Sequence, residues 1–473
     1  MKPGVAVIGG GPAGIGAALS AARAGLAVTL FDEQPGAGGQ VYRPLPAPFA
    51  ADSGPDAEVG RRLRAELAAS SVDARFARKV WFVGPAADGY EVRAVGPEGA
   101  ETLTAPRLIA ATGTTERIVP FPGWTTPGVM GLAATTIMLK AQHLLPGANV
   151  VVAGVGPLLA AVAVGILKQG GRVAAVVDLA GVGEWAAAMP AMAARGDLLA
   201  RGIGWVAQIK RAGVPMLARH AVVAVDGGDR VTAVHVAPVD ASGRPSGPSR
   251  TIAADSLAIG HGLIPATEIP RILGAAVEYD AARGGWITRA DAYGATTVPG
   301  LYVAGDGAGI AGAAAALEGG RLAGLAAARD AGVLPADRFA AESAPLLAAS
   351  RRAARFGGAM ARMMAIRPGL VAAIAHDTVV CRCEDVTRGE IDEAIGAGAR
   401  DVNQLKSWTR CGMGPCQARI CGDVVGELIA PAVGGRLAAG ISTARPPLRP
   451  LPYHALAGTF AYDELNLPAP APS

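Results

Sequence analysis

The five cysteines of this chain all lie in one short segment near its C-terminal end, between residues 381 and 421. An odd number of clustered cysteines does not suit a framework of disulfide bonds and favours a metal or iron–sulfur site. Four of them form a Cys-x-Cys pair and a Cys-x4-Cys pair, and four thiolates are the ligand set of a [2Fe–2S] cluster. The predicted ligands are Cys381, Cys383, Cys411 and Cys416.

Other uses of these cysteines fit the spacing less well. Structural zinc usually takes Cys-x2-4-Cys pairs, so the Cys-x-Cys spacing is tight for it. A redox-active disulfide and buried inert cysteines are the remaining alternatives. Gly412 and Gly414 favour the cluster, because glycines let a loop wrap tightly and turn N–H groups toward sulfur. We expect Cys421 to be a helix core residue that points elsewhere, while a register in which it replaces Cys416 stays open.

Nucleotide chemistry is indicated at the N-terminal end, where a Gly-x-Gly-x-x-Gly motif follows an apolar run. Gly9 permits a tight turn, Gly11 lets the backbone approach a pyrophosphate, and Gly14 lets the next helix pack close to the strand. The free N–H groups at the helix start attract phosphate. Asp32, at the end of the next predicted strand, can accept hydrogen bonds from both ribose hydroxyls, with Glu33 as the second choice. The predicted turn comprises Gly9, Gly11, Pro12, Ala13 and Gly14.

Two further stretches favour FAD over NAD at this site. Gly39 and Gln40 follow the acidic residue closely and suit a second approach of the backbone to phosphate. Residues 301–306 read as an apolar strand that ends in Gly305 and Asp306, before a glycine-rich helix start. A carboxylate there can hold the ribityl hydroxyls of a flavin, although a single aspartate in this position could also be a helix N-cap.

A second strand–turn–helix pattern begins near residue 150. Gly154 and Gly156 match the first two glycines of the motif, but Leu159 stands in place of the third. Asp178 follows at the distance expected for a carboxylate that reaches a ribose. Three alternatives remain open for this second site: use of NAD(P)H, binding of another adenine nucleotide, and no ligand at all.

These residues require a particular set of elements to position them. Strands alternate with helices over residues 4–33 and 147–178, which predicts an α/β fold with parallel sheets and helices on both faces. Residues 76–112 and 218–258 read as strands, and residues 335–372 read as helical. The expected fold is therefore two Rossmann-like domains, followed by a small helical domain that carries the cysteines.

Composition excludes several classes of function. With 51% hydrophobic and 17% charged residues the chain is not disordered, and a net charge of +4 with interspersed signs gives no case for nucleic acid. The apolar run Val150–Leu167 has the length of a transmembrane helix, but Gly154, Gly156 and Pro157 divide it into strand, turn and helix. We expect no transmembrane segment. Because the first predicted strand begins at Val5 without a signal peptide, we expect a cytoplasmic protein, or one peripheral to the inner membrane.

The N-terminal motifs resemble those of the flavoproteins with two dinucleotide-binding domains, such as glutathione and thioredoxin reductases. The resemblance covers residues 1–330, and it implies FAD between the N-terminal region and the segment near residue 305, with a nucleotide-binding-like domain inserted between them. It adds three expected FAD-binding residues, which are Arg43, Thr112 and Gly113. Relatives that reduce disulfides carry a redox cysteine pair near the flavin; this chain has none there, so we expect no disulfide reduction.

The C-terminal segment, residues 376–430, resembles the bacterioferritin-associated-ferredoxin-like (BFD-like) [2Fe–2S] domain. A narrower resemblance rests on the motifs at residues 38–43, 120–129 and 411–417. They are similar to those of the larger electron-transfer subunit of opine oxidases, of the B component of hydrogen cyanide synthase, and of the α subunit of D-hydroxyproline or proline dehydrogenase complexes. This resemblance runs nearly from end to end.

We expect five regions along the chain. They are a discontinuous FAD-binding domain at residues 1–135 and 288–345, an inserted NAD-like domain at 136–287, a helical linker at 346–375, the BFD-like domain at 376–432, and a Pro-rich arm at 433–473. An irregular loop is predicted at Pro44–Pro55.

The narrower resemblance implies an electron-transfer role. A smaller FAD-containing partner subunit would oxidise a C–N bond, and electrons would pass through the FAD and [2Fe–2S] cluster of this chain to an acceptor. A small ferredoxin-like subunit and an FMN at a subunit interface are further expectations from relatives. We expect no catalytic residue here, because the six histidines are scattered; His261 and His376 are the least ordinary of them. The rival hypotheses are a self-sufficient NAD(P)H oxidoreductase that uses the Gly154 turn, and a scaffold with vestigial cofactor sites.

Overall fold

The computed structural model describes residues 4–44 and 54–455. Its first domain is built on a five-stranded parallel sheet in the order β20-β7-β1-β2-β3. The strands are β1 (Gly4–Ile8), β2 (Ala27–Phe31), β3 (Asp73–Arg75), β7 (Leu108–Ala110) and β20 (Leu301–Val303). The first and last of these strands are about 300 residues apart in sequence, so this domain is assembled from both sides of an insertion.

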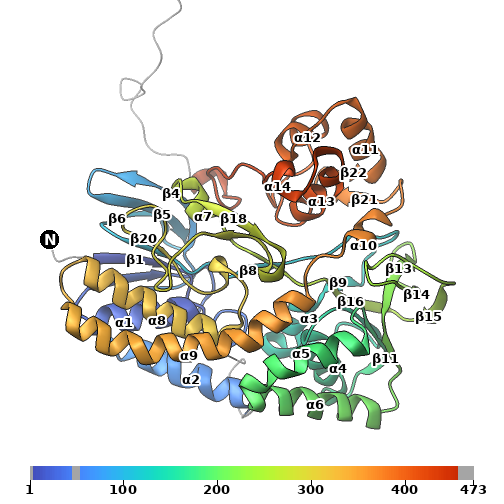
Figure 1. Cartoon of the computed structure of the whole chain (residues 1–473), viewed down its shortest axis with the longest axis horizontal. Coiled ribbons are helices and arrows are strands. Elements are labelled where there is room, and N and C mark those ends of the chain that lie inside the picture. The colour runs from blue at the N-terminus through green and yellow to red at the C-terminus, as the bar shows by residue number, and fades with distance from the viewer. Residues whose placement is uncertain (1–3, 45–53, 456–473) are drawn as a thin grey trace, which may run out of the picture.

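Helices cover one face of this sheet, and a small antiparallel sheet lies on the other (Figure 1). The helices are α1 (Pro12–Arg23), α2 (Pro55–Ala68), α8 (Ala313–Asp330) and α9 (Ala336–Met363), and the sheet consists of β4 (Lys79–Ala86), β5 (Gly89–Gly96) and β6 (Gly99–Ala105). Helices α1 and α8 pack very closely, because a Cβ on Gly320 would lie only 1.9 Å from the carbonyl oxygen of Ala13. Small residues therefore set the distance between these two helices.

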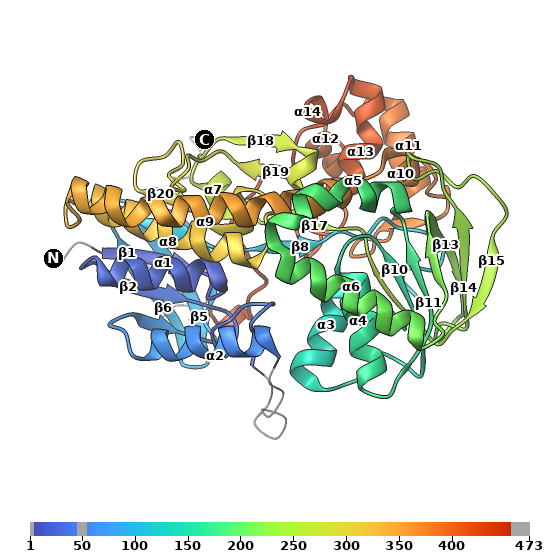
Figure 2. The ribbon, with the colours of Figure 1, turned by 60° about the horizontal axis from the view of Figure 1, so that its bottom comes forward.

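The inserted domain repeats the architecture. Its parallel sheet has the order β12-β11-β10-β16-β9. The strands are β9 (Val129–Gly131), β10 (Asn149–Gly154), β11 (Arg172–Asp178), β12 (Met216–Ala218) and β16 (Ser256–Gly260). Figure 2 shows α3 (Leu132–Ile137), α4 (Leu158–Lys168) and α6 (Gly196–Arg211) on one side of it, and the sheet of β13 (His220–Asp226), β14 (Ala233–Pro238) and β15 (Arg250–Ala253) on the other.

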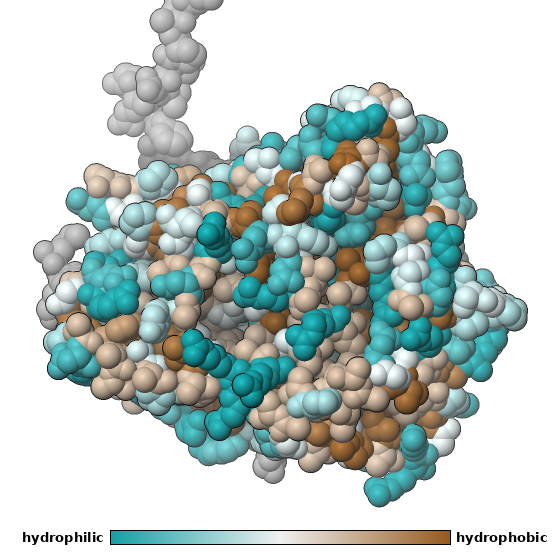
Figure 3. Space-filling model, in the orientation of Figure 1, coloured by the Kyte–Doolittle hydropathy of each residue, from teal (hydrophilic) through white to brown (hydrophobic). Residues whose placement is uncertain are grey.

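The apolar run Val150–Leu167 divides into β10, a glycine turn and α4, as predicted. No helix in the described part of the chain is both long and apolar enough to cross a membrane. Hydrophilic side chains are spread over the face of the molecule shown in Figure 3.

Short elements connect the two sheets. β8 (Thr114–Glu116) pairs with β17 (Leu263–Pro265), and the hairpin of β18 (Val277–Asp280) and β19 (Gly285–Thr288) leads back to the first domain. Helix α7 (Glu268–Ile272) lies between them in the chain, and α5 (Val182–Met192) packs against α9. The predicted helical stretch at residues 335–372 consists of α9 and the short α10 (Pro368–Ala372), with a turn between them.

The cysteine segment folds into a separate helical unit above both sheets (Figure 1). It contains the strand pair β21 (Val379–Cys381) and β22 (Val386–Thr387), then α11 (Arg388–Ala397), α12 (Val402–Thr409), α13 (Gly422–Val433) and α14 (Arg436–Ala439). Thr387 and Glu390 form a capping box at the start of α11, and Asp401 caps α12. The predicted fold class is confirmed: two Rossmann-like domains and a small helical domain.

The predicted Pro-rich arm begins with α14 and then runs back over the first domain. The backbone N–H of Leu448 donates to the carbonyl oxygen of Trp81, and the Leu448 side chain is buried. Most of the predicted loop at Pro44–Pro55 and residues 456–473 of the arm lie outside the described residues.

Candidate functional site

The first glycine turn has the geometry of a phosphate-binding loop. Gly9 has φ +108°, and a Cβ there would lie 2.3 Å from the carbonyl oxygen of Ala111. A Cβ on Gly14 would lie 1.7 Å from the carbonyl oxygen of Gly9, so only glycine lets α1 approach the strand this closely. Pro12 stands at the first position of α1, and Ala13 is buried beneath it. The roles that the motif predicts for these residues agree with this local structure.

Residues 38–40 lie directly across the turn. A Cβ on Gly39 would be 2.8 Å from the Cα of Gly11, so the two backbones are in contact. Gln40 accepts a hydrogen bond from Arg43 at 3.3 Å; the Gln40 side chain is exposed and that of Arg43 is partly buried. A second backbone segment therefore borders the first glycine turn, and binding of a pyrophosphate there stays a prediction.

The two acidic candidates at the end of β2 point in different directions. Asp32 accepts hydrogen bonds from the backbone N–H groups of Gly10 and Gln34 and lies against the turn. Its burial raises the pKa of the carboxyl group. Glu33 is half-exposed and forms an ion pair of 3.8 Å with Arg449 in the C-terminal arm. The geometry therefore favours Asp32 over Glu33 as the ribose ligand.

The tertiary structure brings Asp306 to the same turn from a distant part of the sequence. It lies in η5 (Gly305–Ala308), directly after β20, and a Cβ on Gly305 would contact the side chain of Ala13 at 2.8 Å. Asp306 accepts a hydrogen bond of 3.1 Å from the N–H of Ala311, and burial raises its pKa. A partly buried carboxylate beside the start of α1 fits hydroxyl groups of a flavin chain.

Thr112 and Gly113 close this site from a third segment. The Thr112 hydroxyl donates to the carbonyl oxygen of Ala266 at 3.2 Å, and its backbone nitrogen borders the Cβ position of Gly9. Gly113 has φ +71° and open space around it. The described residues thus form a continuous cradle of glycines with two partly buried carboxylates, which fits an FAD molecule.

The second glycine turn differs from the first in what lies on it. Gly154 is as closely packed as Gly9, since a Cβ would lie 1.8 Å from the carbonyl oxygen of Gly260. However, a Cβ on Gly156 would meet the Sδ atom of Met364 at 2.7 Å, so the thioether covers the turn. Leu159 is 3% exposed and fills the place of the third glycine.

The predicted ribose carboxylate of the second site also has partners within the chain. Asp178 accepts hydrogen bonds from the indole N–H of Trp185 at 2.7 Å and from the N–H of Ala180 at 2.9 Å. Burial raises its pKa to about 6. Both features that would hold a dinucleotide here, the open glycine turn and the free carboxylate, are therefore occupied by side chains of this chain.

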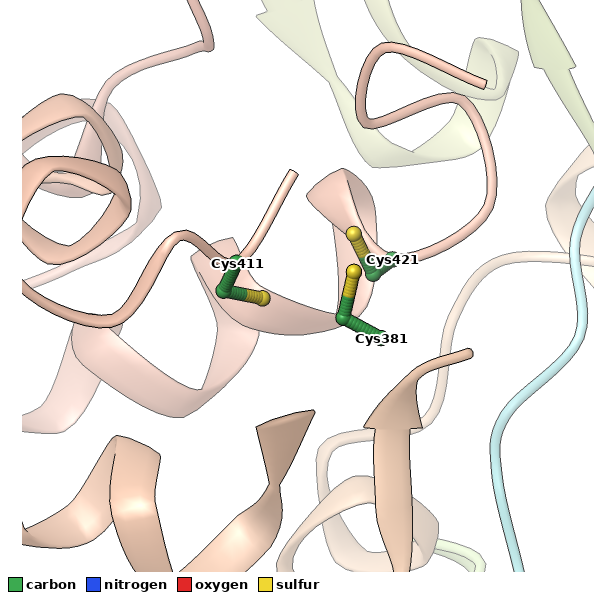
Figure 4. A group of neighbouring side chains, drawn as sticks. All are labelled: Cys381, Cys411 and Cys421. Atoms are coloured by element: carbon green, nitrogen blue, oxygen red, sulfur yellow. The ribbon is translucent and has the colours of Figure 1, made fainter. Parts of the chain in front are cut away.

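All five cysteines converge in the helical domain. The Sγ atoms of Cys381, Cys411 and Cys421 lie within 4.8 Å of one another, and all three residues are buried (Figure 4). Cys383 receives a hydrogen bond from the backbone N–H of Cys416, so these two lie side by side next to the group of three. The expectation that Cys421 points away from the others is wrong: it is the N-cap residue of α13, and its sulfur faces Cys381.

Hydrogen bonds within the cysteine group stabilise one thiolate. Thiol donors on Cys411 and then Cys421 lower the pKa of Cys381 to about 2, while the pKa values of Cys411 and Cys421 are raised. The N–H of Gly412 also donates to the sulfur of Cys381 at 3.4 Å. A Cβ on Gly414 would clash with Cys383 at 2.2 Å. A buried set of soft sulfur ligands with N–H groups turned toward it fits an iron–sulfur cluster.

A cavity of about 330 Å³ lies between the cysteine loop, the C-terminal arm and the first domain. Trp286 lines this cavity, and its indole nitrogen is buried without a hydrogen-bond partner among the described residues. The cavity is also lined by several cations, which are Arg271, Lys406, Arg419, Arg436 and Arg445. Glu268 and Asp423 are its acidic residues.

The two least ordinary histidines have structural partners. His261 is buried, and its Nδ1 accepts a hydrogen bond of 3.1 Å from the N–H of Val119. Burial, and then the nearby Arg117, lower the pKa of His261 to about 4. His376 packs against Gly389, where a Cβ would lie 2.3 Å from its ring.

Comparison with known proteins agrees with this geometry. The sequence pattern of the pyridine nucleotide-disulphide oxidoreductases matches residues 3–332, and that of the BFD-like [2Fe-2S] binding domain matches residues 379–431. The chain belongs to the pyridine nucleotide-disulphide oxidoreductase family. As a member of that family with an added [2Fe–2S] domain, it is an FAD-dependent oxidoreductase.

Its relatives in this family include subunits of two known enzymes. Hydrogen cyanide synthase subunit HcnB of Pseudomonas protegens is 35% identical over 456 residues, which cover 95% of this chain and 96% of that protein. An opine oxidase subunit of Rhizobium meliloti is 34% identical over 463 residues, covering 94% and 96%. The resemblance that the sequence motifs predicted is confirmed.

Solved structures confirm the fold of this family member. L-proline dehydrogenase from P. horikoshii is 20% identical and has a TM-score of 0.69, with 97% of this chain and 80% of that chain covered. Thioredoxin reductase from T. acidophilum is 23% identical with a TM-score of 0.52, and it covers 69% of this chain. The helical [2Fe–2S] domain is what extends this chain beyond the reductase fold.

Proposed function

We propose that this chain is the electron-transfer subunit of a multi-subunit dehydrogenase that oxidises a C–N bond. A partner flavoprotein would take the electrons from the substrate, and the FAD and [2Fe–2S] cluster of this chain would pass them to an acceptor. The observation that carries the proposal is the combination of a flavin cradle and a cysteine cluster in one chain whose second dinucleotide turn is covered by Met364. The names of the relatives support the partner and the C–N bond.

In this proposal FAD is bound by the first cradle. It supplies two-electron chemistry and the cluster one-electron chemistry, so the two together connect hydride transfer to single-electron carriers. The protein's part is to bind and orient: the turn at residues 9–14 accepts the pyrophosphate, Asp32 the ribose, and Asp306 the ribityl chain. No described side chain near the cradle forms an acid–base pair suited to substrate, which supports a substrate site on another subunit.

The cluster ligands in this proposal are Cys381, Cys383, Cys411 and Cys416. Because Cys421 lies among them, a set in which it replaces Cys416 or Cys411 is the alternative. Five sulfurs surround a site that needs four, so one cysteine must be dispensable for assembly of the cluster.

We also propose the partners and the third cofactor that the relatives imply. They are a smaller FAD-containing subunit, a small ferredoxin-like subunit, and an FMN at a subunit interface. The cationic cavity beside the cysteine loop has the charge that an FMN phosphate requires, and it lies next to the cluster domain. A mass spectrum of the cofactors released from the purified complex tests this: FMN in addition to FAD is expected, and FAD alone would contradict it.

The experiment that tests the proposed function uses the complex of this chain with its partner, without air. Opines, proline, hydroxyproline and glycine are added in turn, and the reduced [2Fe–2S] cluster, which belongs to this chain, is followed by electron paramagnetic resonance. One of these substrates is expected to give the signal. If the cluster stays oxidised with every one of them while dithionite reduces it, the proposal is wrong.

The same preparation distinguishes the rival function. A self-sufficient NAD(P)H oxidoreductase requires that NADH or NADPH alone bleach the flavin absorbance. Because Met364 covers Gly156 and Trp185 occupies Asp178, little change is expected. Rapid bleaching by NADH would favour the rival, and colourless, iron-free protein from cells that assemble clusters normally would favour a scaffold.

A further inference from the structure

Arg117 is the largest fully buried side chain in the described part of the protein, with 1% of its surface exposed. It directly follows β8, one of the strands that connect the two sheets. A buried guanidinium is costly unless its N–H groups and its charge are all satisfied. Its partners therefore identify the parts of the molecule that it holds together.

The guanidinium bonds to three regions that are far apart in sequence. Its Nε donates to the Asp423 carboxylate in the [2Fe–2S] domain at 2.7 Å. One terminal nitrogen donates to the carbonyl oxygen of Gly284 in the β18–β19 hairpin at 2.9 Å. The other donates at 3.0 Å to the carbonyl oxygen of Met364, at the start of the linker to the [2Fe–2S] domain. Arg117 thus touches the flavin domain, the linker and the [2Fe–2S] domain at once.

Asp423 is the acceptor in the [2Fe–2S] domain, in the first turn of α13. It is buried and also accepts a hydrogen bond of 3.0 Å from Arg436. The contact between the two domains is therefore an ion pair in which Asp423 lies between two guanidinium groups.

The same charged group continues to the hairpin of the flavin domain. Arg436 forms an ion pair of 3.2 Å with Glu427 and lies 5.1 Å from the centre of the Tyr279 ring. The Tyr279 hydroxyl, in β18, donates to Glu427 at 3.1 Å. The contacts at Arg117 and Tyr279 therefore join the flavin domain to α13 and α14, beside others such as the Glu268–Arg419 ion pair of 2.7 Å.

We propose that Arg117 is a positioning residue that locks the [2Fe–2S] domain onto the flavin domain and so fixes the separation between the two redox groups. The proposal rests on the proposed function only in that both groups are present. Separating the domains would remove the only carboxylate that pairs with Arg117 in the described structure, while Asp423 would keep Arg436. The loss of this buried ion pair opposes movement of the cluster away from the flavin. Electron transfer then occurs in one fixed arrangement.

The test uses the full chain with its cofactors and two variants, Arg117→Met and Asp423→Asn. The asparagine is nearly isosteric with aspartate, so this variant removes the charge and leaves the packing. The matched control is Arg338→Met, which removes an exposed arginine of α9 whose partner is Glu342. FAD and iron per chain are measured first, so that loss of a cofactor is not mistaken for loss of positioning.

Two measurements test whether Arg117 holds the [2Fe–2S] domain in place. Hydrogen–deuterium exchange is expected to rise in residues 365–378 and 422–433 in both variants and to stay unchanged in Arg338→Met. A laser flash then photoreduces the flavin in the presence of an amine donor, and the absorbance shows how fast the cluster is reduced. A misplacement of roughly 1 Å is enough to slow a positioned reaction severely, so a loss of about tenfold or more in this rate is expected.

The proposal is overturned if exchange in both segments matches that of the control, or if exchange rises while the rate stays within twofold of the unaltered chain. If Arg117→Met does not fold, the exchange and the electron-transfer rate of Asp423→Asn alone test the proposal. The outcome is independent of the partner and of the C–N substrate. If the variants transfer electrons more slowly but no substrate reduces the cluster, the proposed function is refuted and the positioning role of Arg117 is still supported.

Discussion

At the scale of single residues, the spacing of the cysteines predicts a cluster domain but does not predict which sulfurs bind iron. The Cys-x-Cys pair and the cysteines that follow identify a cluster domain from sequence alone. Which four of the five sulfurs bind iron depends on how the loop at residues 411–421 folds back on β21. Cys421 was expected to face away because it lies five positions after Cys416, but the chain between them is a turn and no helix, so helical periodicity does not apply there.

Replacement of each cysteine by serine tests the ligand set. Cys381→Ser and Cys383→Ser are expected to abolish the cluster, because every candidate set contains both. If the proposed set is right, Cys411→Ser and Cys416→Ser also lose it and Cys421→Ser retains it. Iron per chain and the visible circular dichroism of the cluster are the measurements. Loss in Cys421→Ser with retention in Cys411→Ser or Cys416→Ser would establish the alternative set.

Asp306 is expected to be required for tight binding of FAD. Asp306→Ala removes a partly buried carboxylate that can bind two hydroxyl groups. Hydrogen bonds to charged groups contribute about 1.5–3 kcal/mol, which corresponds to roughly 10- to 100-fold weaker binding. FAD retained after gel filtration is measured. Glu33→Gln is the control, since Glu33 faces Arg449. Equal FAD content in Asp306→Ala and the unaltered chain would contradict the role.

At the scale of elements, local patterns predicted the strands, turns and helices, but they did not predict the partner of each element. The run Val150–Leu167 reads correctly as strand, turn and helix, and the nucleotide motif of this second turn looks nearly complete. Only the course of α9 reveals that its end carries Met364 onto Gly156. Residues so far apart in sequence meet because α9, at 28 residues and about 42 Å, extends from one domain to the other.

The close packing of α1 against α8 can be tested by adding a methyl group between the two helices. Gly320→Ala would place a Cβ 1.9 Å from the Ala13 carbonyl oxygen, so the helices must separate, and overpacking of this kind costs about 1–3 kcal/mol. A lower melting temperature and a lower FAD content are expected, because Ala13 belongs to the phosphate turn. Gly319→Ala is the matched control: it meets nothing within 4 Å and should stabilise α8 by up to about 1 kcal/mol. Equal melting temperatures for the two variants would contradict this reading of the interface.

Glu116, at the end of β8, predicts a pH dependence of stability. It accepts hydrogen bonds from the N–H of Ala133, in the first turn of α3, and burial raises its pKa to about 7 from an ordinary value of 4.5. Between these two pH values the folded state holds more protons than the unfolded state, so stability falls as pH rises and the loss is complete above pH 7. A shift of this size corresponds to roughly 3 kcal/mol.

The variant Glu116→Gln removes this titration. Relative to the unaltered chain, its free energy of unfolding is expected to improve by roughly 3 kcal/mol between pH 4.5 and pH 8. Urea denaturation at several pH values measures it. Glu342→Gln, on the exposed face of α9, is the control. Parallel pH curves for Glu116→Gln and the unaltered chain would show that Glu116 does not titrate in this range.

At the scale of the whole molecule, the two Rossmann-like domains have similar sheets but different surroundings. The cradle at Gly9 is built from β1, β2, β7 and β20 and is bordered by open glycine backbone. The turn at Gly156 is covered by the same segment that leads to the [2Fe–2S] domain. The first glycine turn is therefore open, whereas in the second Met364 lies against Gly156.

Ligand-induced stabilisation distinguishes these roles in the intact chain stripped of FAD. FAD at 100 times its dissociation constant is expected to stabilise the folded state by about 2.7 kcal/mol, since it binds only the folded form. NADH and ATP at millimolar concentration are expected to leave the melting temperature unchanged. A clear rise with NADH would show that Met364 moves aside and that the second turn accepts a nucleotide.

The sequence by itself determined the chemistry of this protein: glycine turns with acidic residues at fixed spacing define a dinucleotide cradle, and clustered cysteines define a sulfur-ligated cluster. These signals are local, because a turn or a Cys-x-Cys pair needs only neighbouring residues. The tertiary structure alone decided which turn stays open, which sulfurs meet, and how Arg117 bonds to Asp423, 306 residues further along the chain. Contacts of that kind arise only when distant elements pack. A buried charge without a partner is costly, so its partner comes from whichever element the fold places beside it.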